Sequence, residues 1–171
     1  QLGRTLASGT TSPEEGPVDG LAATATRIVA AAARTCAIDA AGALSCWGLD
    51  DPLPLALDAH EPMHELRASP TGGVFCGLAG ETRAPVCFGR PETDSAFWPE
   101  GGSEPRAAPS PMHRSPLPTD VRAIANDAAT ACIVSESGEL WCWGANDRGQ
   151  LAQGRSGAAE TIPVRVTIPA G

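Results

Sequence analysis

The segment His60-Glu61-Pro62-Met63-His64 spells the His-Glu-x-x-His pattern of zinc metalloproteases. In those enzymes both histidines lie on one face of a helix and bind zinc, while the glutamate acts as the general base. Pro62 lies between the two histidines, where a proline costs a helix interior about 3 kcal/mol. The segment is therefore expected to be a turn. His60, Glu61 and His64 are weak candidates for metal ligands, and neither a metal nor a cofactor is predicted.

Six cysteines form the second chemical pattern, and they fall into three pairs. In each pair the second cysteine follows the first by ten or eleven residues and leads an aromatic residue and a glycine: TCAIDAAGALSCWG at 35–48, FCGLAGETRAPVCFG at 75–89 and ACIVSESGELWCWG at 131–144. Six cysteines allow 15 disulfide pairings. Reduced thiols or a zinc site are the alternatives, but the close Cys-x-x-Cys spacing typical of zinc sites is absent from the sequence.

The elements that carry these cysteines are predicted to be β-hairpins, because apolar runs flank a short polar stretch with a glycine. If Glu136-Ser137-Gly138 is a three-residue loop with glycine in the left-handed region, Ser135 pairs with Glu139. Counting outward then sets Cys132 opposite Cys142. Opposed cysteines at non-hydrogen-bonded positions have Cα atoms about 4.5 Å apart, at the short end of the range for a disulfide.

The other two copies follow the same counting, and the repeat therefore selects one pairing among the possible ones. The first copy has Ala40-Ala41-Gly42 as its loop, and the second has Glu81-Thr82 at a longer tip. The predicted disulfides are Cys36–Cys46, Cys76–Cys87 and Cys132–Cys142. Each closed loop of roughly ten residues would contribute about 2–3 kcal/mol to stability.

A short strand is expected before each hairpin, so that the three units lie near 25–48, 65–89 and 121–144 in a single repeat domain spanning 1–171. The stretch 90–120 is rich in proline and is expected to be an irregular, exposed loop. Trp47, Trp141 and Trp143 occupy repeated hairpin positions and are expected to pack between units. Trp98 lies outside that register, which makes it a speculative contact residue together with Asp39 and Glu136 at the hairpin tips.

The composition indicates in which compartment the protein is found and which partners are not expected. Paired cysteines are typical of an oxidising compartment, which predicts an extracytoplasmic protein that is secreted, periplasmic or on the cell surface. The chain starts with Gln1, which indicates a processed piece. The sequence has no lysine, twelve scattered arginines and a net charge of −8. Nucleic-acid binding is not expected from this balance, and no apolar run is long enough to insert into a membrane.

The sequence resembles the regulator-of-chromosome-condensation repeat family. The resemblance rests on Gly149-Gln150-Leu151, a proline-valine step, a strand, and a hairpin that ends in Cys-Trp-Gly. It is strong at 121–164, good at 1–48 and poor at 50–120. It implies an all-β fold, a seven-bladed β-propeller built from four-stranded blades of about fifty residues. Three units would form a partial or open propeller with antiparallel hairpins.

The resemblance and the composition together predict a non-enzymatic, extracytoplasmic β-propeller segment that binds another protein or a surface macromolecule. Further repeats of the same parent chain are also expected as partners. One alternative is a secreted hydrolase, zinc-dependent or glycosidase-like, that uses the 50–120 region. The other alternative is a passive surface spacer. Hairpin tips and connectors are where a rigid repeat scaffold is expected to make its contacts.

Overall fold

The protein is described here from a computed structural model. The structure describes residues 16–21, 24–31, 33–48, 51–70, 73–89, 106–111, 117–118, 120–127 and 129–167, with the backbone alone at 51–52 and 106–111. Every regular element in these residues is a strand. The strands are β1 (Ala25–Ala31), β2 (Arg34–Asp39), β3 (Leu44–Gly48), β4 (Asp51–Leu57), β5 (Met63–Ala68), β6 (Val74–Ala79), β7 (Ala84–Gly89), β8 (Arg106–Pro111), β9 (Val121–Asn126), β10 (Thr130–Ser135), β11 (Leu140–Asn146) and β12 (Gly157–Val166).

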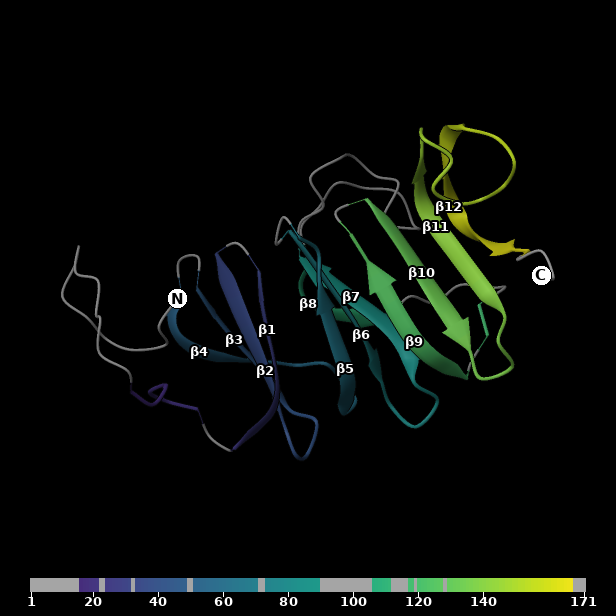
Figure 1. Cartoon of the computed structure of the whole chain (residues 1–171). Helices are drawn as coiled ribbons and strands as arrows, with labels where there is room; N and C mark the ends of the chain where they lie inside the picture. The colour runs from purple at the N-terminus through teal and green to yellow at the C-terminus, as the bar shows by residue number, and fades with distance from the viewer. Residues whose placement is uncertain are drawn as a thin grey trace.

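The twelve strands form three four-stranded antiparallel sheets, each an up-and-down meander in chain order. The first sheet holds β1–β4, the second β5–β8 and the third β9–β12. Figure 1 shows the three sheets side by side in chain order, with β5 between the first and third sheets. The first strands of successive sheets contact one another, β1 with β5 and β5 with β9. This is the arrangement of β-propeller blades around an axis, and the arc of three blades is not closed.

The central hairpins have the register that the sequence predicts. Cys132 lies opposite Cys142, and Ile133 lies opposite Trp141. The N–H of Ser135 donates to the carbonyl of Glu139 at 2.9 Å, and Gly138 at the loop end has φ of 85°. The structure joins the six cysteines in the predicted way, as Cys36–Cys46, Cys76–Cys87 and Cys132–Cys142, with Cα separations of 4.0, 4.1 and 4.1 Å.

Backbone crowding explains why glycine follows the aromatic residue in each copy. Gly48, Gly89 and Gly144 have φ of 100°, 108° and 104°, a region that other residues rarely adopt. A Cβ at Gly144 would also lie 2.1 Å from the carbonyl oxygen of Ala129, which already accepts a hydrogen bond from Ala145 N–H. The motif therefore coincides with an irregularity in the pairing of β3, β7 and β11 with the fourth strand of each sheet.

Two apolar clusters fill the spaces between the blades. The cluster between the first and second sheets is made of Cys36, Ile38, Leu44, Cys46, Ala59, Met63, Leu66, Phe75, Ala79, Val86 and Phe88. The cluster between the second and third sheets is made of Val74, Cys76, Leu78, Cys87, Val121, Ile124, Ala131, Ile133 and Trp143. In each case the disulfide of the earlier sheet faces the later one. The tryptophan at position 143 is fully buried here, and Trp141 packs against the same cluster.

Each sheet has a fourth strand, as the family resemblance implies, but the residues of these strands do not by themselves predict it. β8 lies inside the stretch 90–120 that was expected to be irregular, and that expectation is wrong for 106–111, which pair with β7. Residues 51–57 and 157–166 likewise form β4 and β12, where the sequence indicates only turn-rich connectors. These outer strands contain Pro52, Pro54, Pro109, Pro111 and Pro163. Proline is tolerated there because one side of an outer strand has no neighbour to bond.

Candidate functional site

The tips of the three hairpins and the linkers before β5 and β9 gather on one side of the molecule, at the lower edge in Figure 1. We call this the tip surface, made of the described residues 39–43, 58–62, 80–83, 117–118, 120 and 135–139. It forms because each sheet is a meander and all three run in the same direction, which brings every β2–β3-type turn to the same side.

Backbone hydrogen bonds tie each tip to a neighbouring linker. Met63 N–H donates to the Gly42 carbonyl of the first tip at 2.9 Å, and Gly80 N–H of the second tip donates to the Pro62 carbonyl at 2.9 Å. In the third tip, Glu136 N–H donates to the Asp120 carbonyl at 2.8 Å. Turns that bond the neighbouring linker have fewer ways to move than free loops, so the tip surface is held as one unit.

Arg83 adds a bond between the second and third blades. Its Nε donates to the Val121 carbonyl at 2.8 Å, and its Nη2 donates to the Arg122 carbonyl at 3.0 Å. The same guanidinium lies 3.7 Å from a carboxylate oxygen of Glu65. Arg83 has φ of 51°, which is uncommon for a residue with a side chain. Its guanidinium is thus directed toward β9, the first strand of the next blade.

Asp39, a predicted binding residue, stabilises its own turn. Its Oδ1 accepts hydrogen bonds from the N–H groups of Ala41 and Ala43 at 2.8 and 2.9 Å. Ser135 has the same place in the third tip, where its Oγ accepts from Glu139 N–H at 3.0 Å. A short polar side chain at this position supplies the acceptor that the turn lacks.

Glu136, the other predicted tip residue, is exposed, and its neighbours give the surface a strong negative charge. The tip surface contains a single arginine, Arg83. The carboxylates of the tip surface are Asp39, Asp58, Glu61, Glu81, Asp120, Glu136 and Glu139. Glu139 is paired with Arg165 of β12 at 2.8 Å. The tip surface therefore presents much of the negative charge of the described residues on one side.

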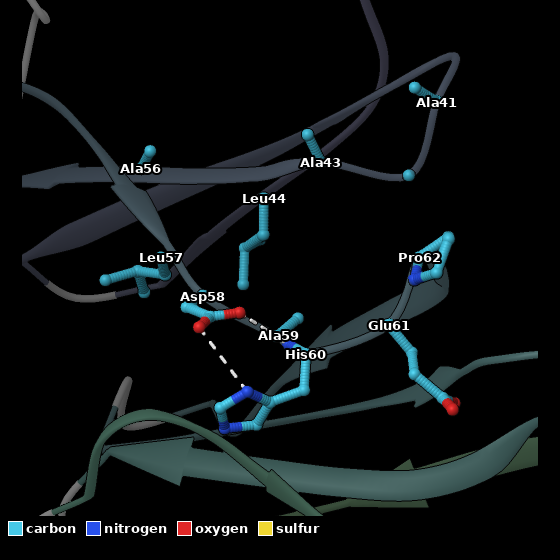
Figure 2. Close-up of a pocket in the computed structure, with 11 residues that line it drawn as sticks. Ala41, Ala43, Leu44, Ala56, Leu57, Asp58, Ala59, His60, Glu61 and Pro62 are labelled. Carbon is cyan, nitrogen blue, oxygen red and sulfur yellow. Dashed lines mark hydrogen bonds and ion pairs between the residues drawn. The ribbon is translucent and has the colours of Figure 1, made fainter.

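The His-Glu-x-x-His segment does not form a helix. His60 lies in a turn with φ of 61°, and its Nδ1 is 3.4 Å from an Asp58 carboxylate oxygen. Figure 2 shows the His60 ring directed at Asp58 while Glu61 points away from it. His64 belongs to β5 and donates from Nε2 to the Gly80 carbonyl at 3.0 Å. Within the described residues, no group of three or more His, Cys, Asp or Glu side chains could hold a metal ion.

A shallow hollow of about 340 Å³ lies on the tip surface between 41–44 and 56–62. Figure 2 shows it lined by small and apolar side chains, with the charged groups of Asp58, His60 and Glu61 at its side. It offers no convergent set of acids and bases, which a hydrolytic site needs. Trp98, the third predicted contact residue, lies outside the described residues.

A second ordered turn, on the β11–β12 connector, was not assigned a role from the sequence. Asn146 is buried, and its Oδ1 accepts from Leu151 N–H at 3.2 Å while its Nδ2 donates to the Arg155 carbonyl at 3.2 Å. The Gln150 side chain donates to Asp147 Oδ1 at 2.8 Å and holds the pKa of that exposed carboxyl below its usual value. The repeat motif at Gly149-Gln150-Leu151 is therefore a structural feature of this connector.

The described residues contain no helix long and apolar enough to span a membrane. The fold and the tip surface together define a class, a β-propeller segment whose blades are stapled by disulfides and whose turns form a locked surface. Comparison with known proteins narrows the class further. The profile of the Regulator of chromosome condensation (RCC1) repeat matches residues 128–150. The chain thus resembles RCC1 repeat proteins, and the matched repeat lies in the third blade.

Solved structures support the same fold. Human WBSCR16 is 21% identical with a TM-score of 0.63, covering 83% of this chain and 40% of that one. Prp20p from Saccharomyces cerevisiae, described with its binding properties to Gsp1p and histones, is 14% identical with a TM-score of 0.68, covering 84% and 38%. Yeast RCC1 (Prp20) bound to Kap60 is 18% identical with a TM-score of 0.67, covering 85% and 36%. No curated protein sequence matches the chain. The chain spans about two fifths of the solved structures it resembles.

Proposed function

We propose that this chain is a non-enzymatic, extracytoplasmic β-propeller segment that binds another protein through its tip surface. The observation that carries the proposal is the set of hydrogen bonds that joins each tip to the linker before β5 or β9 and that joins adjacent blades through Met63 and Arg83. A surface whose turns are already fixed loses little conformational entropy on binding. Such a surface is suited to recognising a partner that is itself folded.

Chemistry favours binding over catalysis. A hydrolase needs a nucleophile or activated water, a base and a group that stabilises the developing charge, all within reach of one another. Of the histidines in the described residues, His60 bonds to Asp58 and His64 to a backbone carbonyl, and the six cysteines are in disulfides. The described residues thus leave the carboxylates to act mainly through their charge.

Three disulfides in one short chain support an extracytoplasmic location, because reducing conditions in the cytosol keep thiols unpaired. Prp20p binds Gsp1p and histones, and yeast RCC1 binds Kap60, which supports a protein as the ligand class here. The seven carboxylates of the tip surface favour a partner whose contact face is basic, since charge complementarity raises the association rate and selects partners.

The test uses the oxidised chain as bait for proteins of the extracytoplasmic fraction, followed by calorimetry with each protein retained. Charge reversal at two exposed tip residues, Glu81→Lys with Glu136→Lys, should weaken binding by at least about tenfold. Asp147→Lys, on the opposite end of the blades, is the matched control and should bind as the wild type does. Unchanged affinity in the double variant, or the absence of any retained protein, would refute the proposal.

A further inference from the structure

The three blades present one residue position that is buried in two of them and exposed in the third. Ile28 pairs with Ala37, the residue after Cys36. Leu66 and Ile124 occupy the same position in the second and third blades, opposite Gly77 and Ile133. Leu66 is 5% exposed and Ile124 is 3% exposed, because each packs against the preceding blade. Ile28 is 66% exposed.

The surface around Ile28 is what we call the leading face, made of Ile28 and Ala30 on the side of the first sheet that points away from the second. Neither residue carries a charge, and Ala37, on the same side, is 3% exposed and already buried. Trp47, farther out on the same sheet, is 3% exposed and is therefore covered already. The open part of the leading face is the inner strand β1.

The opposite end of the arc has the complementary surface. The trailing face consists of Cys132, Val134, Leu140 and Val164, which the register places, together with the buried Cys142, on the side of the third sheet away from the second. Its counterparts in the first blade, Ile38 and Leu44, are each 2% exposed because the second blade covers them. Val134 and Leu140 are only half-buried.

Two surfaces join successive blades, and each is uncovered at one place: the leading face on the first blade and the trailing face on the third blade. Leu66 lies in one cluster with Cys36 and Ile38 of the blade before it, and Ile124 lies in one cluster with Cys76 and Leu78. Ile28 would meet the same kind of partner if it lay against Cys132 and Val134. An apolar residue two-thirds exposed costs free energy in water, and burial against an apolar face recovers it.

We propose that the leading face of one copy docks on the trailing face of a second copy, with Ile28 against Cys132 and Val134 in the way that Leu66 and Ile124 lie against the blade before them. The second copy is the occupant that fits, because its Ile28 stands where Leu66 and Ile124 stand in the two internal contacts. The two faces differ, so the contact is head-to-tail. Contacts of this type close into rings or extend into filaments, depending on the rotation between copies.

The experiment measures the mass of the full 171-residue chain, with its disulfides intact, by light scattering over a series of concentrations. The mass should rise above the 17.4 kDa of one copy as the concentration increases. Ile28→Arg removes the leading face and Val134→Arg removes the trailing face, so each variant alone should stay monomeric. A mixture of the two retains one intact pair of faces and should give a one-to-one dimer and nothing larger.

Leu55→Arg is the matched control. Leu55 is 54% exposed on β4, and its register opposite Cys46 places it on the side of the first sheet that faces the second blade. Association of this variant should equal that of the wild type. Near-ultraviolet circular dichroism checks that each variant is folded, and Leu140→Arg replaces Val134→Arg if the latter is not.

A wild-type chain that stays monomeric at every concentration would overturn the proposal. Self-association that survives both arginine variants would overturn it as well, since the contact would then lie elsewhere. A mixture that remains monomeric would exclude the head-to-tail arrangement, because only unlike faces can pair between the two variants.

Discussion

At the scale of single residues, the glycine after each cysteine-aromatic pair is explained by a backbone conformation and a close backbone contact that leave no room for a Cβ. Two independent features require it at Gly144, a φ of 104° and a backbone oxygen 2.1 Å from where a Cβ would lie. Gly138 differs in one respect. Its φ is 85°, but nothing lies within 4 Å of a Cβ built there. Comparing substitutions at the two glycines therefore distinguishes the free-energy cost of a positive φ from the cost of a steric clash.

Gly144→Ala should lower the free energy of unfolding by more than about 2 kcal/mol, because the substitution adds a clash with Ala129 to the left-handed strain. Gly138→Ala should lower it by only about 1 kcal/mol, from the strain alone. Equilibrium denaturation with urea measures both. Equal losses at the two sites would contradict the contact seen at Gly144.

At the scale of elements, the central hairpins could be predicted from the sequence and the outer strands could not. Apolar runs, a turn with a glycine and cysteines at matching distances from that turn together predict each hairpin. The strand at 106–111 reads Arg-Ala-Ala-Pro-Ser-Pro, which lacks the β-branched and aromatic residues typical of strands and contains two prolines. It becomes a strand because β7 offers it an edge to bond, and sequence periodicity does not report that tertiary contact.

The disulfide staples should differ in how much each stabilises the fold, although all three close loops with sequence separations of 10 or 11. Replacing Cys132 and Cys142 by serine should cost about 2–3 kcal/mol through the loop closure lost in the unfolded chain. The same change at Cys76 and Cys87, both fully buried, should cost more because two hydroxyls are placed in an apolar cluster. Thermal unfolding followed by calorimetry compares the two, and a larger loss at Cys132 and Cys142, of which Cys132 is only half-buried, would be contrary to the burial pattern.

The β11–β12 connector should respond to pH through Asp147. The hydrogen bond from Gln150 holds the pKa of this carboxyl below its ordinary value of 3.8, so the bond contributes to the order of the connector above that pH. The contribution is lost as the pH falls through the lowered pKa. Carboxyl titration by NMR should show the pKa of Asp147 below that of an ordinary aspartate, and Gln150→Ala should raise this pKa toward 3.8. Arg148→Ala, which removes a smaller cause, should raise the pKa less.

At the scale of the whole molecule, the chain is an open arc whose blades are joined by two apolar clusters and by hydrogen bonds along the tip surface. Repeat counting predicts three stapled units, but it does not tell which side of each sheet faces its neighbour. That information lies in tertiary packing, and it separates the buried Leu66 and Ile124 from the exposed Ile28. The candidate site was predicted in part. Asp39 and Glu136 lie on the tip surface, whereas the contacts that Arg83 makes with β9 have no sequence signal.

Peptide mapping of the unreduced chain tests the stapled three-blade arrangement most directly. Trypsin cleaves after arginine but not before proline, so peptides 35–67 and 123–148 each contain one complete cysteine pair, while Cys76 and Cys87 fall on 68–83 and 84–106. The first two peptides should be lighter by two hydrogen atoms than after reduction, and 68–83 should be recovered covalently linked to 84–106. A disulfide joining cysteines of different blades, or six free thiols, would contradict the arrangement.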